Sequence, residues 1–344
     1  MGRLPTSYRS SFEIVLVCIV LLGLVGASCA YDRRAIPTTK AASPSEERDA
    51  DSPEGAFSWV RLPGLPSPRS ELAALYHEGK IYAAGGLEPG PDGSGRVSNA
   101  FEVFDTNTNE WRKLAPLPEP RHHPALAALG GVVYLIGGFT DAAFKPSEKV
   151  FAYDIASGKW SEAPPLPEPL GAGGAATLEE TVYFVGGVDA SGKASRRLYA
   201  LQGSKWLRKQ DMPTAREHLA VASTGAFLYA LGGRPPITDA AERYDPDTDS
   251  WESIAPKPTA RGGIAGAGVG GRFACAAGGE DSVATYADVE CYDEQDGVWR
   301  RLPQMPTARH GVGAAGSEKS FYVVGGGDRP GMSATAAFEQ LQIQ

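Results

Sequence analysis

A short motif that ends in arginine recurs along this chain. It reads Pro-Ser-Pro-Arg69 at its first occurrence and Pro-Thr-Ala-Arg309 at its last. The complete set of these arginines is Arg69, Arg121, Arg216, Arg261 and Arg309. A guanidinium group suits planar, bidentate recognition of a carboxylate. We therefore consider two roles: the arginines bind an acidic ligand, or each ties adjacent repeats together through backbone carbonyl groups or the chain's own acids, such as Glu102 and Glu242.

Other candidates for ligand binding lie close to this motif. Arg234 opens a short link over residues 234–240, and four histidines follow the motif arginines by one or two places: His122, His123, His218 and His310. Histidines gathered in this way could hold a metal ion. No carboxylate accompanies them at a matching spacing, so we expect hydrogen bonding to the scaffold or to a ligand, and no metal site.

The elements that must position these residues belong to a repeat. Pairs of glycines end six apolar, strand-like segments, as in Tyr82-Ala-Ala-Gly85-Gly86, and successive pairs are 52, 49, 46, 46 and 47 residues apart. The six tryptophans fall on the same period: Trp59, Trp111, Trp160, Trp206, Trp251 and Trp299. A period of about 50 residues is that of the kelch repeat. Over residues 58–344 the chain resembles the kelch-repeat family.

One repeat predicts four antiparallel strands, and six repeats predict a six-bladed all-β propeller. In the second repeat the strands are expected at 124–129, 132–136, 149–154 and from Trp160 onward, because these runs are apolar, β-branched or aromatic and are separated by turns. The segment Trp59–Leu62 is a fourth strand with no blade before it, and the last repeat ends at a third strand, Phe338–Gln342. The N-terminal strand should complete the C-terminal blade and close the ring, which removes open sheet edges.

The motif arginines occur in the links that lead into each blade's first strand. Five such arginines would surround one mouth of the central channel, on the face where the links between second and third strands vary in length. In the third blade the motif carries Leu170 instead. From this arrangement we expect a binding module for a protein or glycan ligand of anionic character.

The resemblance also offers an enzyme as the alternative. Six-bladed kelch proteins of the bacterial periplasm include sialic-acid mutarotases, and a Glu or His beside an Arg would supply their acid–base chemistry. Copper oxidases of this architecture need two Tyr, two His and a cross-linked Cys, which this chain does not match, and no cofactor is implied. An enzyme should show a deep pocket with an acid or His near an Arg, and a binding module a broad face.

Composition and the N-terminal residues indicate where the protein works. The formal net charge is −8 without a basic stripe, which excludes nucleic acid as a partner. Residues 1–29 resemble a signal peptide with a lipobox, in which the apolar run Ile14–Ala27 leads to Cys29, the candidate for lipidation; Gly26 departs from that motif. Lipidation, cleavage after Ala30 and an uncleaved anchor stay open. All three predict an exported protein, periplasmic or on the cell surface and lipid-anchored in the first case, with residues 30–57 as a disordered tether.

The last prediction concerns the two cysteines of the repeat region. Cys275 occupies the place of a tyrosine in the strand before Gly278-Gly279, and Cys291 lies in the next strand. If Gly278 faces Asp288, the antiparallel register puts Cys275 opposite Cys291, since position numbers along an antiparallel ladder add to a constant. Directly opposed Cα atoms are close enough for a disulfide bond, which an exporting pathway would allow to form. The alternative is two buried thiols packed between blades.

Overall fold

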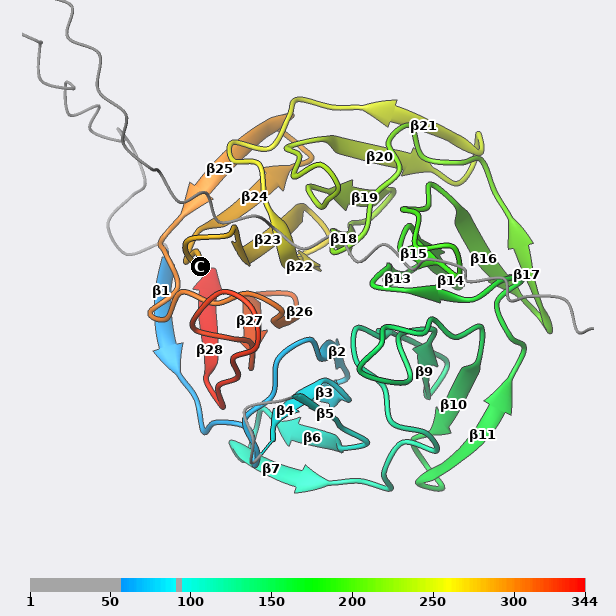
Figure 1. Ribbon diagram of the computed structural model, residues 1–344. Coiled ribbons are helices and arrows are strands. Elements are labelled where there is room, and N and C mark those ends of the chain that lie inside the picture. Colours follow the sequence, from blue (N-terminus) through cyan, green and yellow to red (C-terminus); the bar gives the residue numbers. More distant parts are fainter. Residues whose placement is uncertain (1–56, 91–94, 344) are drawn as a thin grey trace, which may run out of the picture. The chain divides into compact units, whose positions relative to one another are not determined.

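The computed structural model describes residues 57–90 and 95–343, and these residues form an all-β ring of six four-stranded antiparallel sheets (Figure 1). The first three blades are built as follows. Blade 1 contains β2 (Ala73–His77), β3 (Lys80–Ala84), β6 (Phe101–Asp105) and β7 (Glu110–Lys113). Blade 2 contains β8 (Ala125–Leu129), β9 (Val132–Ile136), β10 (Val150–Asp154) and β11 (Lys159–Ala163). Blade 3 contains β13 (Gly174–Leu178), β14 (Thr181–Val185), β16 (Leu198–Gln202) and β17 (Lys205–Arg208).

The remaining three blades repeat this order. Blade 4 contains β18 (Ala220–Ser223), β19 (Leu228–Leu231), β20 (Ala241–Asp245) and β21 (Ser250–Ser253). Blade 5 contains β22 (Gly262–Val269), β23 (Phe273–Glu280), β24 (Val289–Asp293) and β25 (Val298–Leu302). Blade 6 contains β26 (Gly313–Gly316), β27 (Ser320–Val324), β28 (Phe338–Ile343) and β1 (Phe57–Arg61). Two short pairs, β4 (Leu87–Pro89) with β5 (Gly95–Val97) and β12 (Leu170–Gly171) with β15 (Val188–Asp189), lie in the connections.

Ring closure by the N-terminal strand is confirmed. β1 pairs with β28 in antiparallel register, with Trp59 opposite Leu341, and so supplies the fourth strand of the last blade. In Figure 1 the blue strand β1 lies beside the red strand β28 at the junction of the ring. Strand β1 begins at Phe57, the first residue that the structure describes.

The glycine pairs allow each blade to approach the next. Gly85 and Gly86 both have positive φ, and a Cβ on Gly85 would lie 2.4 Å from the backbone oxygen of Arg121 in the following blade. The N–H of Gly86 donates to the same oxygen at 2.8 Å. In all six pairs the N–H of the second glycine donates to the backbone oxygen at the motif position that leads into the next blade, at 2.7–3.0 Å. The backbone of the next blade's arginine motif, or of Leu170 in blade 3, therefore occupies the space beside each glycine pair.

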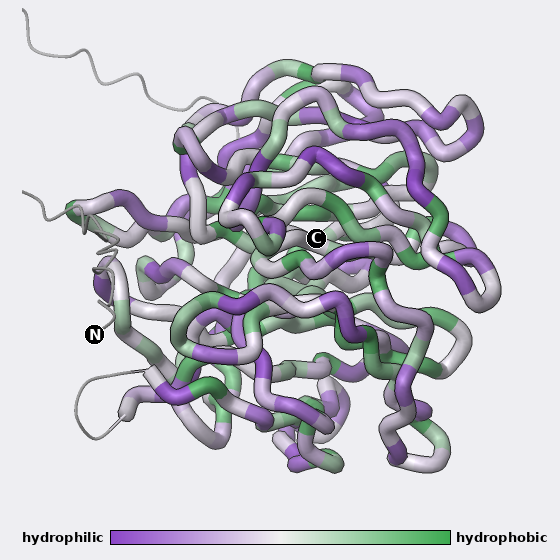
Figure 2. Tube along the Cα trace, turned by 45° about the vertical axis from the view of Figure 1, so that its right-hand side comes forward, coloured by the Kyte–Doolittle hydropathy of each residue, from purple (hydrophilic) through white to green (hydrophobic). Residues whose placement is uncertain are grey.

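The core lies between neighbouring blades. Aromatic and aliphatic residues of adjacent sheets fill six clusters, and each tryptophan of the outer strands donates its indole N–H to a carbonyl of the preceding blade, as Trp111 does to Pro63 at 2.7 Å. Figure 2 shows that the hydrophobic residues concentrate along the inner parts of the strands, while the loops are mostly hydrophilic. The first strands of the blades line the central channel and are rich in small residues, Ala and in some blades Gly.

The predicted register of the two cysteines is confirmed. Cys275 on β23 lies directly opposite Cys291 on β24, their Cα atoms are 4.0 Å apart, and the structure contains a disulfide bond between them. Both side chains are buried.

The predictions for the N-terminal residues concern another part of the chain. Cys29, the signal-like residues 1–29 and residues 30–56 of the expected tether lie outside the described residues. Among the residues that are described, no helix has the length and apolar character needed to span a membrane.

Candidate functional site at the channel mouth

The motif arginines do not line the channel mouth, and this part of the prediction is wrong. Their side chains point into their own blades, and each residue is at most 5% exposed. The five residues are Arg69, Arg121, Arg216, Arg261 and Arg309. A buried guanidinium needs charged and hydrogen-bonding partners within the protein. Each has them, so the arginines belong to the scaffold; the acids that they bind lie in their own blade or link, whereas a tie between adjacent blades was expected.

Three of the five arginines share one arrangement. Arg69, Arg216 and Arg309 each bond a glutamate on the third strand of their own blade at 2.6 Å, namely Glu102, Glu242 and Glu339. Arg121 and Arg261 instead pair with Glu119 and Asp288, each at 2.8 Å.

The residues that do surround the mouth lie two places after each motif position. They form a ring of six equivalent positions, one per blade: Glu71, His123, Ala172, His218, Gly263 and Gly311. All six have φ between 50° and 68°. Backbone hydrogen bonds connect neighbouring members, for example from His123 N to Glu71 O at 2.7 Å and from Glu71 N to Gly311 O at 2.6 Å. The left-handed backbone turns the side chains at these positions towards the channel axis.

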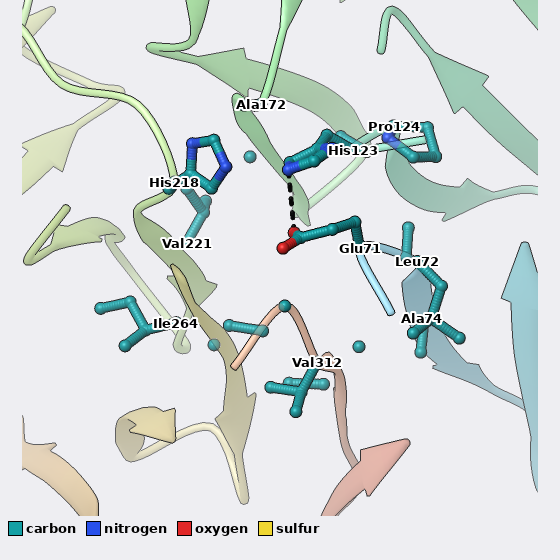
Figure 3. Close-up of a pocket in the computed structure, with 18 of the residues that line it drawn as sticks. Glu71, Leu72, Ala74, His123, Pro124, Ala172, His218, Val221, Ile264 and Val312 are labelled. Atoms are coloured by element: carbon teal, nitrogen blue, oxygen red, sulfur yellow. Dashed lines mark ion pairs between the residues drawn. The ribbon is translucent and has the colours of Figure 1, made fainter. Parts of the chain in front are cut away.

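Three members of the ring carry functional side chains, and these converge. Nε2 of His123 is 2.9 Å from a carboxylate oxygen of Glu71, and the rings of His123 and His218 have centroids 4.6 Å apart. Figure 3 shows Glu71 and His123 pointing towards each other and His218 facing the same space from across the channel. One potential ligand atom from each of the three lies within 4.8 Å of the others. Glu71 and the two histidines are therefore a candidate binding site for a metal ion or for a polar ligand group.

Further polar residues contact the Nδ1 atoms of the two histidines. Nδ1 of His123 is 2.7 Å from Nδ1 of His122, whose Nε2 is 2.9 Å from the backbone oxygen of Asp141. Nδ1 of His218 contacts the carboxylate of Glu217.

Two more groups complete the polar network at the mouth. Arg234 donates from Nε to Glu217 at 3.1 Å and lies 3.5 Å from Glu280. His310 is 2% exposed, and its Nδ1 is 3.4 Å from Glu71 and 3.5 Å from Glu280, in neither case with the geometry of a hydrogen bond.

Charge states in this network follow from burial and from neighbouring charges. Burial acts to raise the pKa of Glu71, but the charge and hydrogen bond of His123, with the contact to His310, hold the pKa well below its ordinary value. Burial, with the charges of His123 and Arg234, lowers the pKa of His218 well below its ordinary value. Burial and the charge of His123 lower the pKa of His122 to about 4. At neutral pH Glu71 is thus ionised, and His122 and His218 are neutral.

Below the ring the channel becomes apolar. The next layer includes Leu72, Ile264 and Val312, and the cavity that this layer and the ring line together has a volume of about 110 Å³. Above the ring, the connections between second and third strands carry four exposed apolar side chains: Phe144 at 48%, Ile237 at 44%, Val283 at 83% and Met332 at 56%. Phe144 packs on His122 with ring centroids 4.9 Å apart, so this apolar rim lies on the same face as the polar ring.

Sequence reasoning found His123, His218, His310 and Arg234 but missed the acids Glu71, Glu217 and Glu280. The expectation that no carboxylate accompanies the histidines is wrong, because Glu71 holds the position in blade 1 that His123 holds in blade 2. Aligning the repeats at the motif, as Arg69-Ser-Glu71 beside Arg121-His-His123, would have revealed this equivalence.

Comparison with known proteins finds kelch-repeat families for this chain. Residues 130–326 match the family model described as the KLHDC2/KLHL20/DRC7 Kelch-repeats domain, and residues 68–118 match the Kelch motif. The chain is 27% identical over 298 residues to the Kelch-like protein terF of Aspergillus terreus, covering 80% of this chain and 61% of that protein. It is 37% identical over 81 residues to the Kelch-like ECH-associated protein 1B of Danio rerio, covering 24% of this chain and 14% of the relative.

A solved structure has the same architecture. The structure of YjhT superposes with a TM-score of 0.67 over 82% of this chain and 99% of that chain, at 16% identity, which is a likeness of fold. The chain spans less than two thirds of the length of the two curated relatives above. With the family model matched over residues 130–326 and six blades present, the chain belongs to the kelch-repeat family.

Proposed function

We propose that this protein is a binding module whose loop face takes up a projecting segment of a partner protein. The observation that carries the proposal is the apolar rim formed by Phe144, Ile237, Val283 and Met332. Each residue comes from the connection between the second and third strands of a different blade, and Phe144 contacts His122 and His123 of the polar centre. Exposed apolar groups gathered over a polar, concave centre are typical of surfaces that bind proteins. One relative of this chain is itself named for its association with another protein.

The chemistry of the mouth changes the expected ligand. An anionic ligand was expected because five arginines were placed at the mouth, and all five are buried and paired. The groups actually present are the carboxylates of Glu71, Glu217 and Glu280, with Arg234 and the histidines between them. We therefore propose a partner segment that is apolar at its flanks and neutral or basic at its tip. Export of the protein, with lipidation at Cys29, remains part of the proposal on the strength of residues 1–29.

The test is peptide selection against the rim. A displayed library of random peptides is panned on the full chain, and enriched peptides are then measured on the variant Phe144→Ser/Ile237→Ser/Val283→Ser/Met332→Ser. Val60, Leu207 and Val298 are exposed apolar residues on outer strands, so their serine variants are the matched control. We expect enriched peptides to lose at least about tenfold in affinity for the rim variant, since a buried apolar side chain contributes about 1.5–3 kcal/mol, and to bind the control unchanged. Equal binding to the rim variant would contradict the proposal.

A sugar enzyme is the second candidate, and one observation favours it. Glu71, ionised and in contact with His123, lies in the same network as Arg234, which is the combination expected of acid–base chemistry at a pocket. Proton-exchange spectroscopy of reducing sugars would detect faster interconversion of anomers. Acceleration that disappears in Glu71→Gln, in a chain from which no peptide is enriched, would favour the enzyme over the binding module.

A further inference from the structure

We propose that Glu71, His123 and His218 bind a divalent transition-metal ion at the axis of the channel, and that Zn²⁺ is the best match. Two imidazole nitrogens and one carboxylate oxygen form a donor set that suits zinc, whereas Mg²⁺ and Ca²⁺ prefer sites built from oxygen atoms. The three donor atoms lie within 4.8 Å of one another. This proposal does not rest on protein binding at the apolar rim, which other residues form.

Hydrogen bonds around the site determine which ring nitrogens face it. A carbonyl oxygen can only accept, so Nε2 of His122, 2.9 Å from Asp141 O, carries a hydrogen. A neutral His122 then accepts at Nδ1, and Nδ1 of His123, 2.7 Å away, donates to it. The other nitrogen of His123, Nε2, faces Glu71 at 2.9 Å and donates its hydrogen to that carboxylate, and a metal ion bound between the two groups would take the place of this hydrogen.

His218 is oriented by the same logic from the opposite side. Its Nδ1 contacts the carboxylate of Glu217, which accepts, and Arg234 holds that carboxylate at 3.1 Å. Nε2 of His218 is therefore the nitrogen with a free electron pair. Histidines that ligate metals usually donate their other N–H to a carboxylate or a backbone carbonyl. In this structure His218 has the first kind of partner directly, and His123 reaches the second kind through His122.

A glycine in the ring provides the space for the carboxylate of Glu71. A Cβ added to Gly311 would lie 2.4 Å from an oxygen of Glu71, so the glycine leaves the space that the carboxylate occupies. His310 adds an independent observation, since its buried Nδ1 has no hydrogen-bond partner although it lies 3.4 Å from Glu71. Four of the six ring positions hold residues other than glycine at positive φ, which is a costly conformation for them. Glu71, His123 and His218 are three of the four.

The spacing requires only local movement to form the site. In a tetrahedral zinc site with bonds of about 2.0–2.2 Å, ligand atoms lie about 3.3 Å apart. Glu71 and His123 already meet at 2.9 Å, so rotation of His218 towards them completes the set. The fourth position is left for water or for a group of a ligand, in the manner of zinc sites with three protein ligands.

The test measures zinc binding to the full chain after treatment with a chelator. Equilibrium dialysis with Zn²⁺ should show one ion per chain at this site, and bound Co²⁺ should show the visible absorption of a low-coordinate nitrogen and oxygen site. We expect His218→Asn and Glu71→Gln each to weaken zinc binding by about 100-fold or more, and Glu217→Gln to weaken it by about 10–100-fold through loss of the orienting carboxylate. Zinc that is still bound by the triple variant Glu71→Gln/His123→Asn/His218→Asn reports sites elsewhere in the chain and is subtracted.

His77→Asn is the matched control, because His77 lies at the other end of β2 and lines the channel away from the ring. It should bind zinc as the parent does. Melting temperatures without metal establish that each variant is folded, and if His218→Asn is destabilised, the isosteric Glu71→Gln decides the outcome. The proposal is overturned if the parent binds no stoichiometric zinc at this site, or if Glu71→Gln binds it as tightly as the parent.

Discussion

At the scale of single residues, the strongest polar contacts of this propeller lie inside the blades. Arg216 is typical: it bonds Glu242 at 2.6 Å and donates to the backbone oxygens of Ala240 at 2.6 Å and Ala230 at 3.2 Å. In blade 3 both partners are replaced, the arginine by Leu170 and the glutamate by Tyr199, whereas in blade 2 Phe151 takes the place of the glutamate and Arg121 pairs with Glu119. A buried charge without a partner is costly, so each motif arginine has a carboxylate partner even where the third-strand glutamate does not supply it.

The first residue-scale prediction therefore concerns Arg216→Ala. The substitution leaves the buried carboxylate of Glu242 without its cation and removes the hydrogen bonds from the guanidinium to the backbone oxygens of Ala240 and Ala230. We expect the free energy of unfolding to fall by about 3–5 kcal/mol, as measured by urea denaturation. The control is Arg208→Ala, which removes an exposed ion pair with Asp211 and should leave stability nearly unchanged. Equal, small effects of the two variants would show that the motif arginines are not structural.

At the scale of elements, two sets of contacts fasten each sheet to its neighbour. On the inner side, the second glycine of each pair donates to a carbonyl of the following blade, as Gly233 does to Arg261 at 2.7 Å. On the outer side, a tryptophan donates to a carbonyl of the preceding blade, as Trp251 does to Gln210 at 2.8 Å. Only blade 5 adds, among the described residues, a covalent link between its second and third strands.

The element-scale prediction is that this link forms when the chain is exported, as proposed above. Cys275 and Cys291 lie opposite each other on neighbouring strands, so an oxidising compartment can join them without moving the backbone. Residues 51–344, secreted and then unfolded without reductant, should show close to zero titratable thiols. Two thiols per chain would instead establish a packed, reduced pair, and titration after reduction provides the control.

At the scale of the whole propeller, closure of the ring depends on a strand from the other end of the chain. β1 pairs along its whole length with β28, and Trp59 donates to Pro303 in the neighbouring blade at 2.8 Å. Without β1 the last blade would expose the edge of β28, and the contact with blade 5 would be lost.

Removing β1 is thus expected to destabilise the entire ring. A chain that begins at Pro63 loses a paired strand and a tryptophan, and loss of a packed tryptophan alone costs about 3–5 kcal/mol, a large share of a typical total of about 5–15 kcal/mol. Thermal unfolding followed by circular dichroism measures the effect. A chain starting at Asp51 is the control, and the closure mechanism would be refuted if both chains melted at the same temperature.

The sequence by itself determined the architecture. The Gly-Gly and Trp spacings predicted six blades, the unpaired segment Trp59–Leu62 predicted closure, and the numbering of one antiparallel pair predicted that Cys275 faces Cys291. These features are readable because each follows from a local rule: the alternation of a strand, the positive φ available to glycine, and the constant sum of paired positions. Each rule is repeated six times or confined to neighbouring strands.

Only the tertiary structure decided where the side chains of the links point. Arg69 and Glu71 are two residues apart, yet the first enters its own blade to meet Glu102 and the second turns to the channel axis. That choice depends on the carboxylate that a distant strand offers and on the left-handed backbone of the ring, neither of which a motif records. The meeting of Glu71 with His123 and His218 likewise arises from closure, because a ring brings equivalent positions of separate repeats to one axis.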